Sequence, residues 1–184
     1  MQNILFCFIS LLVLTFSAEA QIGKVFPTMK CKNIDEKSLT LPTELDKRKS
    51  VLCLAYSQKA QEKLQVWVNQ AIPKFVLRSS ETSVFPLEPY NVNTYFIAMY
   101  TGAAKAFANQ ATDQIKTNVD VLLHPYILTY TGELEPYKTS LKMINKDDPY
   151  IFVLDENGKV IYTTSGIYTD KAMGEIENLI AEEE

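Results

Sequence analysis

Residues 147–180 read DDPYIFVLDENGKVIYTTSGIYTDKAMGEIENLI, and this stretch decides the fold that the sequence predicts. Two apolar runs, at 150–154 and 159–163, are separated by Asp-Glu-Asn-Gly, and an Asn-Gly pair is typical of a tight hairpin turn. Gly166 ends the second run, and Thr169 can cap a following helix. The apolar face of that helix would consist of Met173, Ile176, Leu179 and Ile180. The stretch therefore predicts a β-hairpin followed by an amphipathic helix.

Upstream of this stretch, short strand patterns alternate with helix patterns. Residues 50–56 (SVLCLAY) form a continuous apolar run, which is typical of a central strand covered on both faces. Residues 58–72 carry apolar side chains at three- and four-residue spacing, with Ser57 as a candidate N-cap and Pro73 as the expected end of the helix. The other expected elements are a hairpin at 28–33 and 38–41, a strand at 82–87, a helix at 94–109, a strand at 121–130 and a short helix at 134–143. This order predicts an α/β sandwich in which a central mixed sheet is flanked by helices.

The composition is that of one globular domain, with 184 residues, 47% of them apolar, and a formal net charge of −4. Because no basic excess exists, we expect no nucleic-acid partner. Residues 4–16 are uncharged and are followed by Ala18-x-Ala20, which predicts a signal peptide at 1–20 that is cut after Ala20. An uncleaved N-terminal anchor is the alternative. We therefore expect residues 21–184 to form one exported domain, periplasmic or extracellular, that is not inserted into a membrane.

The C-terminal stretch resembles the closing segment of thioredoxin-like proteins of the exported thiol-disulfide oxidoreductase and peroxiredoxin type. Residues 23–56 (GKVFPTMKCKNIDEKSLTLPTELDKRKSVLCLAY) are similar to the N-terminal hairpin and first core strand of those proteins. Residues 141–166 (LKMINKDDPYIFVLDENGKVIYTTSG) are also similar to the thioredoxin-like mitochondrial ATP-synthase assembly factors. The resemblance implies a thioredoxin-like sandwich that begins with a β-hairpin and ends with a hairpin plus helix. It also puts Pro149 in the place of the family's cis-proline.

The sequence departs from the oxidoreductases where their chemistry resides. Those enzymes carry Cys-x-x-Cys just after the first core strand, where a helix N-terminus lowers a thiol pKa. Residues 56–61 here read Tyr-Ser-Gln-Lys-Ala-Gln, without sulfur. The resemblance therefore implies a redox-silent member with no catalytic residue and no cofactor. The same resemblance suggests an edge that binds an extended protein or peptide, made of Tyr56, Ser57, Gln58, Asp148, Pro149 and Tyr150.

Two cysteines and one histidine remain as candidates for other chemistry. Cys53 lies within the apolar run and fits a buried, inert thiol. In an exported protein, a structural disulfide between Cys31 and Cys53 is an alternative, and an exchange-active pair is a further alternative. His124 is the only histidine, and we expect a hydrogen-bonded structural residue there. A metal site or a hydrolytic triad with Ser57 and Asp155 has no sequence signature.

Two classes of function follow from these observations. In the first, a catalytically silent thioredoxin-like domain binds a protein or peptide partner and acts as an assembly factor. In the second, the protein is an enzyme, either a thiol-disulfide redox protein that uses Cys31 and Cys53 or an unrelated hydrolase. The missing thiols after Tyr56 favour the first class.

Overall fold

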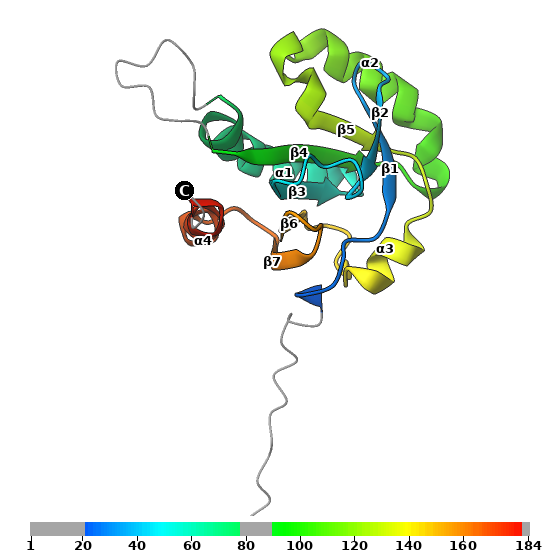
Figure 1. Ribbon diagram of the computed structural model, residues 1–184. Coiled ribbons are helices and arrows are strands. Elements are labelled where there is room, and N and C mark those ends of the chain that lie inside the picture. The colour runs from blue at the N-terminus through cyan, green and yellow to red at the C-terminus, as the bar shows by residue number, and fades with distance from the viewer. Residues whose placement is uncertain (1–20, 78–89, 182–184) are drawn as a thin grey trace, which may run out of the picture.

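The computed structural model of the protein describes residues 21–77 and 90–181 (Figure 1). The expected signal peptide at 1–20 and the expected strand at 82–87 lie outside these residues. Within the described ranges, no helix is both long enough and apolar enough to cross a membrane.

A single seven-stranded sheet organises the molecule, with the strand order β2-β1-β5-β4-β3-β6-β7. Strands β3, β4 and β5 are mutually parallel, and every other neighbouring pair is antiparallel. The strands are β1 (Met29–Asn33), β2 (Ser38–Leu41), β3 (Lys49–Ala55), β4 (Val92–Met99), β5 (Ile127–Tyr130), β6 (Tyr150–Leu154) and β7 (Val160–Ser165). The helices are α1 (Gln58–Ala71), α2 (Ala108–Asn118), α3 (Glu135–Ser140) and α4 (Asp170–Ala181), with shorter turns η2 (Ile72–Val76), η3 (Gly102–Phe107) and η4 (Val121–Tyr126). This architecture confirms the predicted α/β class.

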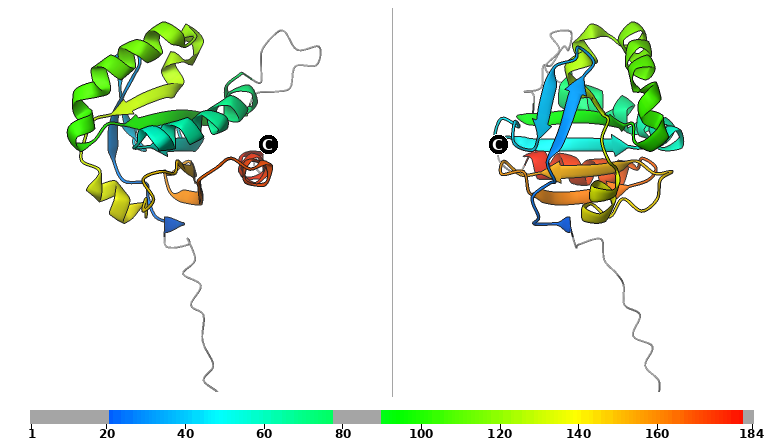
Figure 2. Two further views of the ribbon diagram at one scale, coloured as in Figure 1. Left: turned by 180° about the vertical axis from the view of Figure 1, so that it is seen from behind. Right: turned by 90° about the vertical axis from the view of Figure 1, so that its right-hand side faces the viewer.

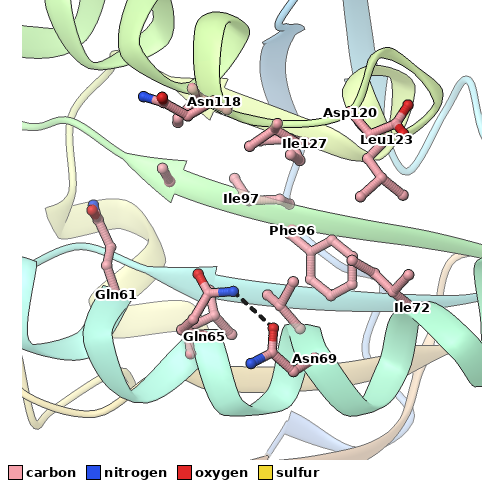
Figure 3. Close-up of a pocket in the computed structure, with 15 residues that line it drawn as sticks. Gln61, Gln65, Asn69, Ile72, Phe96, Ile97, Asn118, Asp120, Leu123 and Ile127 are labelled. Atoms are coloured by element: carbon pink, nitrogen blue, oxygen red, sulfur yellow. Dashed lines mark hydrogen bonds between the residues drawn. The ribbon is translucent and has the colours of Figure 1, made fainter.

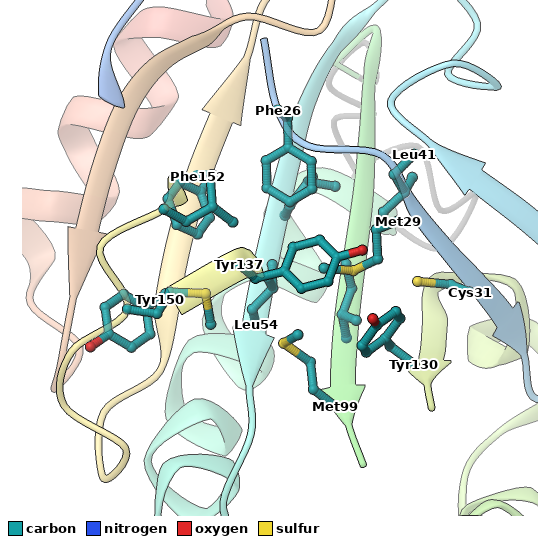
Figure 4. Packing of buried hydrophobic residues seen from close by; sticks show 14 of the residues in the cluster. Phe26, Met29, Cys31, Leu41, Leu54, Met99, Tyr130, Tyr137, Tyr150 and Phe152 are labelled. Carbon is teal, nitrogen blue, oxygen red and sulfur yellow. The ribbon is translucent and has the colours of Figure 1, made fainter. Parts of the chain in front are cut away.

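Both faces of the sheet are covered, each by its own hydrophobic core. On one face α1 and α4 pack over the sheet through side chains that include Trp67 and Ile176. On the other face Phe26 and Tyr137 pack against Phe152 and its neighbours (Figure 4). Because it lies between β4 and β6, strand β3 is buried at all seven of its residues, as its continuous apolar run predicts.

Most of the expected elements form, with two differences along the middle of the chain. The helix expected at 94–109 is wrong, because residues Val92–Met99 form β4 and a 3₁₀ turn and α2 follow it. Strand β4 contributes Phe96 to one core and Ile97 to the other, so apolar side chains are required on both faces and their spacing imitates that of a helix. The expected strand at 121–130 is strand only at its end, after the 3₁₀ turn η4.

Local signals explain the ends of several elements. The Ser57 hydroxyl accepts a hydrogen bond from the Ala60 N–H at 3.1 Å, which caps α1, and the Thr169 hydroxyl caps α4 through the Ala172 N–H at 3.2 Å. Pro73 does not end the helical path as predicted, because the π turn η2 continues from Ile72 to Val76.

The turn between β6 and β7 depends on one glycine and one aspartate. Gly158 has a φ of 75°, and a Cβ atom at this position would lie 2.7 Å from Pro42. The Asp155 carboxylate accepts hydrogen bonds from the Asn157 and Lys159 N–H groups at 2.9 and 2.8 Å. Of the predicted Asn-Gly pair, only the glycine has a positive φ, because the aspartate side chain closes the rest of the turn.

Candidate functional site

The six residues of the predicted binding edge lie at one end of the sheet. Ser57 follows β3 at its carboxyl end and begins α1, with Gln58 exposed beside it. Strand β6 runs antiparallel to β3 and pairs Tyr150 with Leu54. The residues before β6, including Asp148, are therefore brought to the N-terminus of α1.

The segment before β6 is held against α1 by hydrogen bonds from the predicted edge. The Ser57 hydroxyl donates to the Lys146 carbonyl at 2.7 Å, in addition to capping the helix. The Tyr56 hydroxyl donates to the Met143 carbonyl at 2.8 Å. The Tyr150 hydroxyl accepts from the Asn145 N–H at 2.7 Å, and its ring stacks on that of Tyr56 with centroids 6.3 Å apart. Burial raises the pKa of both phenols, so they remain protonated donors.

Two ion pairs that the sequence analysis missed complete this end of the molecule. The Lys59 ammonium lies 3.1 Å from the Asp147 carboxylate, and the Lys63 ammonium lies 2.5 Å from that of Asp148. The hydrogen bond from Lys59 lowers the pKa of Asp147. The available signal was the spacing of the two lysines, four residues apart on one helix face, together with two adjacent aspartates.

The expectation of a cis-proline before β6 is wrong. The bond between Asp148 and Pro149 is trans, and among the described residues the cis bond is Leu41–Pro42. Main-chain groups on either side of this bond are used within the protein. The Asp148 N–H donates to the Asn145 carbonyl at 3.3 Å, and the Pro149 carbonyl accepts from the Gly166 N–H at 3.0 Å.

The two cysteines are free thiols, so the suggested disulfide between them is wrong. Cys31 lies in β1 and belongs to the core on the α3 side, whereas Cys53 lies in β3 and belongs to the core under α1. Strands β5 and β4 separate them, which is about 14 Å at the usual strand spacing, and a disulfide needs Cα atoms within about 7 Å. Burial raises the pKa of each thiol to about 12.

His124 is buried and hydrogen-bonded, as predicted. Its Nδ1 lies 3.2 Å from the Asp35 carboxylate, and its Nε2 lies 3.3 Å from the Val119 carbonyl. His124 lies in η4, at the amino end of β5, whereas Ser57 lies at the carboxyl end of β3, and β3, β4 and β5 run parallel. The structure therefore does not bring Ser57 and His124 together as a triad. Within 21–77 and 90–181, no group of three or more His, Cys, Asp or Glu residues is placed to hold a metal ion.

A cavity of about 400 Å³ lies between α1 and α2, above β4 and β5 (Figure 3). Its floor is apolar and includes Phe96 and Ile127. Its rim carries uncharged amides from both helices, and the Gln65 amide donates to the Asn69 amide oxygen at 3.0 Å. This cavity holds no titratable pair, so its chemistry is that of an apolar groove.

A five-stranded core with the order β5-β4-β3-β6-β7, an N-terminal hairpin and a final helix define a thioredoxin-like protein. The thioredoxin domain of a thiol-disulfide oxidoreductase from Bacteroides vulgatus is 12% identical with a TM-score of 0.55, and the match covers 86% of this chain and 97% of that one. An exposed lipoprotein thioredoxin from Streptococcus pneumoniae is 13% identical with a TM-score of 0.51, over 83% of this chain and 99% of that one. A thio-disulfide isomerase from Thermus thermophilus is 14% identical with a TM-score of 0.51, over 87% and 96%. At these identities the likeness shows the fold.

The family is shown by the sequence. The family described as ATP10 protein matches residues 17–181, and the chain belongs to this family. No curated protein sequence matches the chain significantly. The predicted thioredoxin-like fold and the predicted resemblance to the assembly-factor family are thus both confirmed.

Proposed function

We propose that this protein is a thioredoxin-like assembly factor that binds a polypeptide partner and performs no thiol-disulfide exchange. The observation that carries the proposal is the chemistry at the N-terminus of α1. Ser57 stands where an exchange enzyme needs a thiolate, and its hydroxyl is used to cap the helix and to hold Lys146. Both thiols of the described chain are buried in strands, with pKa values raised to about 12.

The family supports a proposal for the partner. The family is named for ATP synthase, and we propose that the partner is a subunit of such a complex before its assembly.

The uncharged run at 4–16 and the Ala18-x-Ala20 site support export of the protein, and one solved structure of similar fold is described as an exposed lipoprotein. N-terminal sequencing of the fractionated protein should begin at Gln21. Full-length protein in the cytosol would contradict export.

The binding surface that we propose is the edge formed by Tyr56, Ser57, Gln58 and residues 148–150. Gln58 is exposed at the helix N-terminus, where unpaired N–H groups favour acceptors of a partner chain. The ion pair between Lys59 and Asp147 lies at the surface beside it. Water screens exposed ion pairs and leaves them little net stabilisation, so a partner's charged groups can replace them at low cost.

Site-specific cross-linking tests this surface. A photo-reactive residue at Gln58 should cross-link to an ATP-synthase subunit in the cell envelope. The matched control is Asn157, an exposed amide in the turn between β6 and β7, at the opposite end of the sheet. Equal cross-linking from both positions, or none from Gln58, would contradict the proposed edge.

The absence of exchange activity is tested separately with an insulin-reduction assay. We expect the rate with the purified protein to equal that of buffer, because neither buried thiol can form a thiolate near neutral pH. A rate above buffer that disappears in Cys31→Ser or Cys53→Ser would instead establish the protein as a redox enzyme.

A further inference from the structure

Strand β7 is an outer strand of the sheet, and only its beginning is paired on the outer side. The N-terminal segment crosses to this edge (Figure 2), where the Gly23 N–H donates to the Val160 carbonyl at 2.8 Å. The Val160 N–H donates in turn to the Lys24 carbonyl at 2.9 Å, and the Phe26 N–H to the Gly158 carbonyl at 2.8 Å. Among the described residues, no strand pairs with the outer side of β7 beyond Val160.

The register identifies the unpaired main-chain groups. The Gly166 N–H donates inward to the Pro149 carbonyl, in line with the β6 and β7 pairing. In an antiparallel pair, the main-chain hydrogen bonds of successive residues point alternately towards and away from the partner strand. The main-chain N–H and C=O groups of Thr163 and Ser165 therefore point away from β6. Thr163 is paired opposite Phe152, which belongs to the core on the α3 side, so its side chain lies on that face.

A cavity of about 650 Å³ runs beside this edge on the α3 side. Tyr150, Thr163 and Ser165 line it from the sheet, and side chains between Lys138 and Ile144 line it from α3 and the following loop. Gln21 also lines the cavity. Only 5% of Gln21 is exposed, and its side-chain carbonyl oxygen is buried without a hydrogen-bond partner. A buried acceptor of this kind costs free energy unless a donor reaches it.

Apolar and basic side chains lie in or near the same cavity. Ile144 lines it and is 83% exposed. Ile22, next to Gln21 in the sequence, is 47% exposed, and Ile167, two residues after β7, is 71% exposed. Lys138 and Lys142 both line the cavity, and the Lys138 ammonium lies 3.3 Å from the exposed Glu135 carboxylate. The edge therefore offers main-chain hydrogen bonds, apolar contacts and an excess of positive charge.

We propose that the outer edge of β7 and this cavity bind an extended segment of a partner protein as an added strand. The segment would span about five residues along 161–165, insert alternate apolar side chains into the cavity and carry a carboxylate towards Lys142. A main-chain N–H of the segment would donate to the Gln21 side-chain oxygen. The inference rests on the proposed function, because it takes the occupant to be a polypeptide.

Fluorescence anisotropy with defined peptides tests the proposal. The probe is a fluorescein-labelled, terminally blocked peptide, Glu-Ile-Thr-Val-Thr-Ile-Glu, and its counterpart carries lysine in place of both glutamates. We expect saturable binding of the acidic peptide and at least about tenfold weaker binding of the basic one. In hydrogen exchange, the acidic peptide should slow the Thr163 and Ser165 amides. Equal affinity for the two peptides, or no saturation up to about 1 mM, would overturn the proposal.

Variants of the β7 edge distinguish strand addition from nonspecific peptide binding. Thr163→Pro removes an outward N–H and should weaken binding of the acidic peptide at least about tenfold. Ile144→Glu, at an exposed position where folding is unaffected, should weaken it as well. Lys142→Glu should reduce the preference for the acidic peptide, whereas the matched change Lys116→Glu on α2 should leave it unchanged. Retained binding in both Thr163→Pro and Ile144→Glu would overturn the proposal.

The same variants distinguish this inference from the proposed function. If Gln58 still cross-links to an ATP-synthase subunit while the acidic peptide does not bind, only the added strand is wrong. If the peptide binds as expected but Gln58 cross-links to no such subunit, the added strand at β7 is supported and the proposed assembly role is wrong.

Discussion

Tyr150 stacks on Tyr56 beside the N-terminus of α1 and also lines the cavity beside the outer edge of β7, yet these two regions differ in how far their polar groups are satisfied. At α1 the hydroxyls of Tyr56 and Ser57 and both carboxylates beside them have partners within the protein. At β7 the outward main-chain groups beyond Val160 and the Gln21 side-chain oxygen have none among the described residues. At the N-terminus of α1 the polar side chains are used within the fold and Gln58 stays exposed, whereas the outer edge of β7 leaves main-chain groups available. The two proposed surfaces therefore differ in the groups that they offer to a partner.

The largest effect is expected from the removal of Tyr150, which lies in both regions. Tyr150→Ala deletes a buried ring, its stack on Tyr56 and its hydrogen bond with Asn145, and we expect the free energy of unfolding to fall by about 3–5 kcal/mol. Tyr150→Phe keeps the ring and should cost only about 1–2 kcal/mol. Urea unfolding followed by circular dichroism measures both. An equal decrease in the free energy of unfolding for the two variants would mean that the Tyr150 ring does not connect these regions.

A smaller effect is expected at the closed region alone. Ser57→Ala removes both the cap of α1 and the hydrogen bond to Lys146, and should cost about 1–2 kcal/mol. Ser57→Thr keeps the hydroxyl and serves as the control. Hydrogen exchange should show faster exchange at the Asp147 and Asp148 amides in Ser57→Ala only. Unchanged exchange there would show that Ser57 does not hold the segment.

The buried thiols predict a pH effect that belongs to neither region. Burial raises the pKa of Cys53 in the folded protein to about 12, from 9.0 in an exposed thiol. The unfolded chain therefore loses this proton first, so the stability contributed by the thiol is complete below about pH 9 and is lost as the pH rises from 9 to 12. Urea unfolding at several pH values should show a shallower decline for Cys53→Ala. If the free energy of unfolding of Cys53→Ala falls with pH as steeply as that of the native protein, the Cys53 thiol does not have a raised pKa.

The smallest effect is expected at the open edge. Thr163→Pro changes an outward N–H and should alter the free energy of unfolding by no more than about 1 kcal/mol. Thr164→Pro, one residue along, removes an inward N–H of the ladder with β6 and should be much more destabilising. Comparing the two variants by urea unfolding tests the register on which the open edge depends. A larger destabilisation by Thr163→Pro than by Thr164→Pro would mean that the outward main-chain groups belong to Thr164.

Local patterns in the sequence were enough to predict the central strand, the last hairpin and the capped helices. Strand β3 is apolar throughout because it is covered on both faces, and Ser57 and Thr169 cap helices through contacts within three residues. Strand β4 was not predicted, because its apolar residues serve two cores and their spacing fits a helix as well. Periodicity alone does not separate these alternatives.

The site was predicted in part, for a different physical reason. The resemblance correctly brought residues 56–58 and 148–150 to one end of the sheet, since the order of strands fixes that placement. The trans bond at Pro149 and the partners of Lys59 and Lys63 depend on how the preceding loop folds. Gln21 gave no signal, because its burial follows from the pairing of residues 23–26 with the start of β7, about 135 residues away in sequence.

The placement of the two cysteines has a consequence for where the fold can persist. With Cys31 and Cys53 sealed in separate cores, the described domain has no disulfide for a reductant to cleave and no accessible thiolate for an oxidant or a mixed disulfide to capture. Its stability therefore does not depend on the glutathione poise of the surrounding compartment. The partner binding that we propose would therefore require no covalent change in the described residues when the surroundings change from reducing to oxidising.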